Sequence, residues 1–96
     1  MIARRRTESF DDEEFARLLE PEAEAVRELY AEGIVRAAWS RADVPGACLL
    51  LEAGSVEDAR AHANRAPLIA NGMIETQFIP LRGYRGFHPR APKGGS

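Results

Sequence analysis

Groups able to move a proton are few in this chain of 96 residues, which holds two histidines and fifteen acidic residues. His62 lies in an alanine-rich stretch, and an imidazole titrates in the range that suits acid/base work. Glu52 would act as a base if burial raised its pKa, and the Tyr84 hydroxyl could donate to a developing oxyanion. We take His62, Glu52 and Tyr84 as catalytic candidates. The alternatives are a boundary histidine, a plain edge carboxylate and an interface tyrosine.

One strand offers a candidate binder for a substrate anion. Arg41 and Trp39 fall on the same face of a strand predicted over residues 34–41. A guanidinium fork beside an aromatic wall can bind a planar carboxylate through two parallel hydrogen bonds. We therefore take Arg41 and Trp39 as substrate-binding candidates. The alternative is a surface ion pair between Arg41 and Asp43.

Arginines also interrupt the first predicted strand, residues 2–7, where Arg4 and Arg6 share one face. A central strand rarely tolerates charged residues unless they face a polar cavity, a partner or an anion. Arg4 and Arg6 are therefore further substrate-binding candidates. The alternative is that this strand is frayed or truncated.

Other kinds of site find little support in the sequence. It contains no Ser-His-Asp set, HExxH, P-loop or GxGxxG motif, and two histidines with scattered acids do not favour a metal site. Cys48 is the only cysteine, which excludes an intrachain disulfide and a Cys-based zinc site. We expect no metal and no cofactor, and a reducing, cytoplasmic environment.

The overall charge also limits the partners that we expect. The formal net charge of −2 provides no basic field for a phosphate backbone, so nucleic acid is not an expected partner. No apolar run approaches the roughly 20 residues that a membrane span needs, and the N-terminus lacks the apolar region of a secretory signal. We expect no membrane partner and a cytoplasmic location.

Helical periodicity dominates residues 11–33, where apolar residues recur at three- and four-residue steps. Pro21 predicts a break, with a short helix before it and a second helix starting at it. Gly33 then predicts the C-terminal stop. Glu22 falls within the apolar stripe, which is unusual for a carboxylate.

A hairpin is predicted next. Val35, Ala37 and Trp39 should share one face of its first strand, and Pro45-Gly46 indicates a type II turn. The return strand, residues 47–53, is a continuous apolar run. Such a run predicts burial on both faces.

Ser55 starts a predicted helix that runs to about Arg65, because a serine followed three residues later by an acid is typical of a capping box. Residues 74–81 form the predicted last strand, and Pro80 within it indicates a sheet edge. The element order is therefore βαββαβ, which predicts an α+β, ferredoxin-like domain with a four-stranded antiparallel sheet over residues 1–83. Residues 84–96 are predicted to be a C-terminal arm or a disordered tail.

Such a sheet carries both helices on one face, so an apolar second face needs a cover. Leu49 and Leu51 point one way, and Cys48 and Leu50 the other. We therefore expect the protein itself to be its partner, as a homodimer or a larger ring of dimers.

The pattern as a whole resembles a known family. It comprises Leu29-Tyr30-Ala31-Glu32-Gly33, then Val35-Arg36 with Trp39, a buried strand ending in Glu52, a helix starting at Ser55, and Ala66-Pro67-Leu68. Over roughly residues 22–81 it resembles the muconolactone isomerase-like family of dimeric α/β-barrel proteins, which is related to the YciI-like proteins. The resemblance implies a cofactor-independent isomerase that moves a proton within a small lactone or aromatic-derived carboxylate, in a pocket completed by a neighbouring subunit.

We accordingly expect a small hydrophobic or carboxylated metabolite as substrate, in aromatic catabolism or a biosynthetic pathway. Two alternatives stay open, because the fold alone does not fix the reaction. One is a non-catalytic member that binds a ligand or assembles a complex. The other is a cofactor-free monooxygenase or cyclase.

Overall fold

The computed structural model of this chain describes residues 1–87, and residues 88–96 of the predicted arm lie outside the described part. Its elements, in chain order, are β1 (Ile2–Arg5), α1 (Asp12–Ala31), β2 (Val35–Ser40), β3 (Gly46–Leu51), α2 (Val56–Ala63), α3 (Pro67–Ala70), β4 (Ile74–Gln77) and the 3₁₀ turn η1 (Arg85–Phe87).

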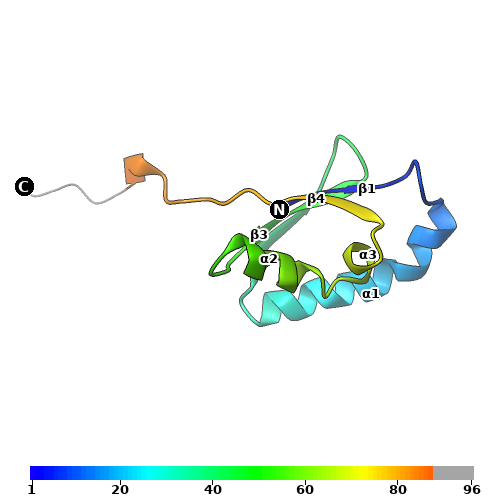
Figure 1. The fold of residues 1–96 in the computed structure, drawn as a ribbon, viewed down its shortest axis with the longest axis horizontal. Coiled ribbons are helices and arrows are strands. Elements are labelled where there is room, and N and C mark those ends of the chain that lie inside the picture. Colours follow the sequence, from blue (N-terminus) through cyan, green and yellow to red (C-terminus); the bar gives the residue numbers. More distant parts are fainter. Residues whose placement is uncertain (88–96) are drawn as a thin grey trace, which may run out of the picture.

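The four strands form one antiparallel sheet in the order β2-β3-β1-β4. Figure 1 shows α1, α2 and α3 on the same side of this sheet, so within residues 1–87 the second face carries no helix. The predicted α+β class and the four-stranded antiparallel sheet are confirmed, and the arrangement is compatible with a ferredoxin-like fold.

Local capping interactions at Asp11 and Gly33 set the two ends of helix α1. The Asp11 carboxylate accepts a hydrogen bond from the Glu14 amide at 2.8 Å, and the Glu14 carboxylate accepts one from the Asp11 amide at 3.1 Å. Gly33, at φ 81°, follows the last turn.

The predicted break at Pro21 was wrong, because α1 is a single helix of 20 residues. Phe15 before the proline and Leu29 after it are both buried, at 3% and 1% exposed. The proline itself is exposed, so its ring faces solvent. Packing at both ends of the helix therefore outweighs the one hydrogen bond that proline removes.

The hairpin between β2 and β3 is confirmed, but its predicted type II turn was wrong. Gly46 lacks the positive φ that such a turn requires; in residues 1–87 only Gly33 and Gly72 have one. Gly46 instead begins β3 beside β1, where a Cβ would lie 2.1 Å from the Ala3 carbonyl oxygen. The glycine is needed for close approach of two backbones.

The predicted shared face of Val35, Ala37 and Trp39 was also wrong. Val35 pairs with Leu51 and Ala37 with Leu50, so the register shifts between them. This irregularity reverses the alternation, as a β-bulge does. Val35 therefore enters the core at 1% exposed, whereas Trp39 lies on the open face at 57% exposed.

Strand β4 is an edge strand, as predicted, but it ends at Gln77 and not at residue 81. Among the described residues its one neighbouring strand is β1, whose first paired residue, Ile2, opposes Gln77. Because β1 begins there, the backbone after Gln77 has no strand to pair with. Pro80 consequently lies beyond the sheet.

The core lies between the sheet and the helices, in two clusters. The first contains the buried residues Phe15, Leu68 and Met73, and the second contains Leu29, Val35 and Leu49. The predicted alternation in β3 is confirmed here, since Leu49 is buried while Leu50, on the opposite face, is 41% exposed. In residues 1–87 no helix has the length and apolar character needed to cross a bilayer.

Candidate functional site

A small cavity, here called the inner cavity, lies between the sheet and helices α1 and α3. Its volume is about 150 Å³, and its walls include Leu29 and Leu49 from one core cluster and Leu68 and Ile74 from the other. Several small residues also line it, namely Ala3, Gly46, Ala47, Ala63 and Ala66. Since alanine and glycine leave little side-chain bulk, the side chains of the two core clusters do not fill the space between them.

Glu22 of α1 is the carboxylate in this cavity. Its Oε1 accepts a hydrogen bond from the Leu68 amide at 2.9 Å, at the start of α3, where backbone amides lack partners within the helix. Burial raises the pKa of Glu22, and the hydrogen bond from Leu68 and the charge of Arg5 only partly oppose this. A carboxylate whose pKa moves toward neutrality becomes a better base.

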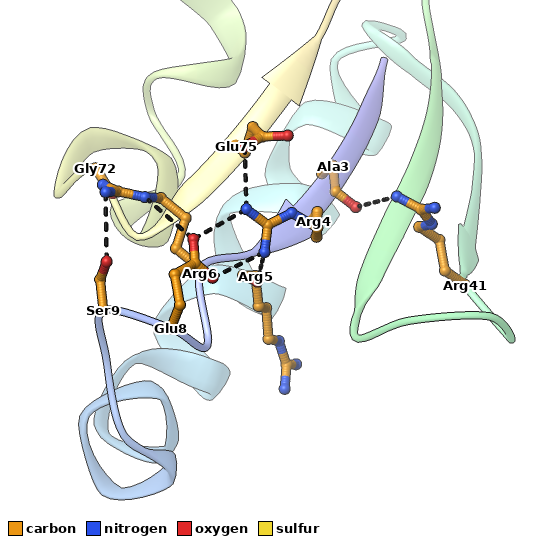
Figure 2. Close-up of polar contacts among 9 residues, drawn as sticks. All are labelled: Ala3, Arg4, Arg5, Arg6, Glu8, Ser9, Arg41, Gly72 and Glu75. Atoms are coloured by element: carbon orange, nitrogen blue, oxygen red, sulfur yellow. Dashed lines mark hydrogen bonds and ion pairs between the residues drawn. The ribbon is translucent and has the colours of Figure 1, made fainter.

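Arg5 of β1 contributes a guanidinium to the wall of the inner cavity. Its guanidinium lies over the Phe15 ring, 5.6 Å from the centroid, and the residue as a whole is half-buried. Figure 2 shows its side chain pointing away from that of Arg4, as successive residues of a strand must. In the described part of the chain Arg5 forms no ion pair, so its donors remain available to an anion.

The other arginines of this segment are held by partners in the same chain (Figure 2). Arg4 donates to both carboxylate oxygens of Glu8, at 2.9 and 3.0 Å, and to Glu75 at 3.0 Å. Arg6 lies after the end of β1 and donates to the Gly72 carbonyl at 2.8 Å. The structure thus gives Arg4 and Arg6 a role in joining β1 to the segments beside it.

The fork of Arg41 is also occupied. Nε and Nη2 donate to the two carboxylate oxygens of Asp43, at 2.9 and 2.7 Å. This is the surface ion pair that the sequence offered as the alternative to substrate binding. The same contact is the main reason that the pKa of Asp43 falls to about 2.

A second, larger hollow, here called the outer cleft, lies beside the ends of β1 and β3. It has a volume of about 610 Å³, and Trp39, Leu50, Glu52, Phe78 and Ile79 are among its lining residues. Two predicted site residues, Trp39 and Glu52, are therefore brought together here. Glu52 is exposed, so its carboxylate remains hydrated.

The remaining catalytic candidates lie elsewhere. His62, on α2, is half-buried and lines neither hollow. Tyr84 is 69% exposed in the segment after β4, where its ring packs edge-on against Phe87 at 5.0 Å. The seven predicted site residues are thus spread over the molecule, and only Trp39 and Glu52 share a hollow.

Arg5 and Glu22 were missed by sequence reasoning as site residues. The signal for Glu22 was present, since a carboxylate within an apolar helical stripe is rarely left unpaired. The signal for Arg5 was its place beside Arg4 in a strand, because neighbours in a strand point to opposite faces. Neither sign alone indicated that the two residues line one cavity.

Comparison with known proteins finds no matching family model, no matching curated protein and no matching solved structure. The fold and the cavity define the chain as an α+β domain with a polar pair inside an apolar pocket. The muconolactone isomerase-like assignment stays a prediction from the sequence.

Proposed function

We propose that this protein is a cofactor-independent enzyme that moves a proton within a small, largely apolar carboxylate held in the inner cavity. The observation that carries the proposal is the pair of Arg5 and Glu22, one cation and one desolvated carboxylate, in a cavity whose other walls are mostly apolar. Ligand pockets commonly have this character, with few polar groups that orient the ligand.

The chemistry follows from the two charges. Arg5 binds the substrate carboxylate, since its fork matches that group and is free of other ion pairs in residues 1–87. Glu22 takes a proton from the carbon next to a carbonyl and, as the carboxylic acid, returns it to another carbon. Ser40, at the rim of the cavity, can donate to the oxygen that carries the transient charge. No electrons are gained or lost, so the step needs no redox partner.

The size of the cavity limits the substrate. An apolar cavity of about 150 Å³ holds one benzene ring, and the inner cavity has about that volume. The ring of a small lactone or aromatic-derived carboxylate fits this limit, with its carboxylate at the wall beside Arg5, whereas a nucleotide or a coenzyme does not.

Muconolactone in deuterated water is a suitable probe, because proton transfer at carbon then exchanges hydrogen for deuterium, which mass spectrometry detects. We expect exchange with the wild type and a loss of about a hundredfold or more in Glu22→Gln, the usual contribution of a general base. Arg5→Met should weaken binding. The matched control is Glu52→Gln, which alters an exposed carboxylate of the outer cleft and should leave the exchange rate unchanged.

Two results would count against this assignment. Equal exchange in the wild type and Glu22→Gln would remove Glu22 as the base. Saturable binding of muconolactone, seen as shifts of the Ser40 and Leu68 amide signals, without any exchange would favour a non-catalytic ligand-binding protein.

A further inference from the structure

Strand β1 carries two neighbouring arginines that are held in different ways. Arg4 donates to the carboxylates of Glu8 and Glu75, at 2.9 and 3.0 Å. Arg5 lies over the face of the Phe15 ring, 5.6 Å from its centroid, and forms no ion pair within residues 1–87. In this part of the chain the Phe15 ring thus stands beside Arg5 where carboxylates stand beside Arg4.

An aromatic ring and a carboxylate leave a guanidinium with different numbers of free donors. A carboxylate accepts hydrogen bonds from the N–H groups, so it occupies the fork that would bind a substrate. A ring face attracts the positive charge through its quadrupole and leaves the edge of the fork unoccupied. Phe15 can therefore hold Arg5 in place while the N–H donors of Arg5 stay open to a carboxylate in the inner cavity.

The Phe15 ring is itself fixed by its surroundings. It is 3% exposed and packs with Leu68 and Met73 in one of the two core clusters. The Phe10 ring meets it edge-on, with the centroids 6.1 Å apart and the planes at 68°. Phe15 is not one of the described residues that line the inner cavity, so its effect on a bound carboxylate has to pass through Arg5.

Helix α1 connects this ring to the proposed base. Phe15 and Glu22 are seven positions apart on α1, which is about two turns and about 10 Å along the axis, so they lie on the same face. The helix continues through Pro21 without a break, and this keeps their spacing constant. One helix therefore carries both Glu22 and the ring that supports Arg5.

We propose that Phe15 is the positioning residue of the inner cavity, which holds the Arg5 guanidinium where it can bind a substrate carboxylate beside Glu22. The inference rests on the proposed function, because it gives Phe15 a role in the site that the function places at Arg5 and Glu22. It adds a residue that contacts neither the substrate nor the reacting atoms.

A double-mutant cycle with benzoate, a planar single-ring carboxylate, tests whether Phe15 acts through Arg5. Benzoate binding is followed by the amide signals of Ser40 and Leu68 in the full chain. Phe15→Leu should raise the dissociation constant about three- to tenfold when Arg5 is present and should have no further effect in Arg5→Met. Phe15→Tyr keeps the ring and should bind benzoate as the wild type does.

Two further proteins separate this role from a general loss of packing. Pentafluorophenylalanine at position 15 keeps a ring of similar shape but reverses the charge distribution of its face, so it should weaken benzoate binding as Phe15→Leu does. It also serves as the test if Phe15→Leu does not fold. Met73→Ala removes another buried side chain of the same cluster, 4% exposed, and should leave the dissociation constant unchanged.

The outcomes distinguish this inference from the proposed function. If Arg5→Met weakens benzoate binding but neither change of the Phe15 ring does, or if Phe15→Leu has the same effect with and without Arg5, the positioning role is overturned alone. Unchanged binding in Arg5→Met would overturn both. The expected cycle without deuterium exchange into muconolactone would support the positioning role and overturn the proton transfer.

Discussion

The carboxylate of Glu22 accepts a hydrogen bond from the amide of Leu68 at 2.9 Å, which joins the middle of α1 to the start of α3 across 46 positions of sequence. The contact satisfies a helix-terminal amide and holds a charged group at the wall of the inner cavity. Because burial dominates there, the pKa of Glu22 is raised, and this has a consequence for stability.

Glu22→Gln should stabilise the fold at neutral pH, because the carboxamide oxygen still accepts from Leu68 and no charge has to be desolvated. A glutamate with a raised folded-state pKa binds its proton more tightly when folded. Its unfavourable effect is therefore absent below the unfolded pKa of 4.5 and grows as the pH rises through the folded value. Urea unfolding at several pH values should show a stability gain that is present at pH 7 and disappears near pH 4. A gain that is the same at both pH values would contradict this account.

The ion pair between Arg4 and Glu8 predicts the opposite dependence of stability on pH. Arg4 is the main reason that the pKa of Glu8 is lowered to about 2, so the stability from this contact is complete above pH 4.5 and is lost as the pH falls toward 2. In Arg4→Gln the pKa of Glu8 should return toward 4.5, measured by NMR titration of its carboxyl carbon.

Arg41→Gln is the matched control for that measurement. It should raise the pKa of Asp43 from about 2 and leave the pKa of Glu8 unchanged. If Arg4→Gln and Arg41→Gln changed the pKa of Glu8 by the same amount, the pairing of Arg4 with Glu8 would not be the cause of its low pKa.

Gly46→Ala should destabilise the protein by at least about 2 kcal/mol, since overpacking in a filled site commonly costs about 1–3 kcal/mol and here the obstacle is backbone. The new Cβ would lie 2.1 Å from the Ala3 carbonyl oxygen, so β1 and β3 would have to separate. Thermal unfolding followed by circular dichroism measures the effect. Gly54→Ala is the control, because its Cβ would meet only the flexible Asp58 side chain at 3.1 Å, and its melting temperature should stay within a few degrees of the wild type.

Leu29→Ala should cost about 2–5 kcal/mol, the usual range for a buried leucine. Leu29 is 1% exposed and packs with Val35 and Leu49 beside the inner cavity. Leu19→Ala on the same helix, where the leucine is 41% exposed, should cost well under half as much. Equal losses of unfolding free energy for the two variants in chemical denaturation would show that the core of the domain lies elsewhere.

Several features were predictable because they depend on neighbouring residues alone. The serine-capped start of α2 at Ser55 and the stop at Gly33 are local hydrogen-bond and dihedral requirements, and both stand where the sequence placed them; the cap at Asp11 falls at the first residue of the predicted helical range. The alternation of leucines in β3 follows in the same way from strand geometry. These signals were sufficient for the α+β class and the sheet.

The errors arose where a distant contact outweighed a local preference. Pro21 does not break α1, because Phe15 and Leu29 pack on either side of it. Gly46 is a glycine because of the Ala3 backbone, which is more than 40 positions away in the sequence. No local pattern contains information of that kind.

By itself, the sequence determined the α+β class, the stop at Gly33 and the alternation of leucines in β3, because each depends on residues within a few positions of one another. Only the tertiary structure decided that Arg5 and Glu22 line one cavity, while Arg4 and Arg41 bind carboxylates and Arg6 binds a backbone carbonyl of the same chain. The physical reason is that the charge state and availability of a side chain depend on burial and on partners brought near by folding, and neither quantity is encoded by residue type and spacing alone.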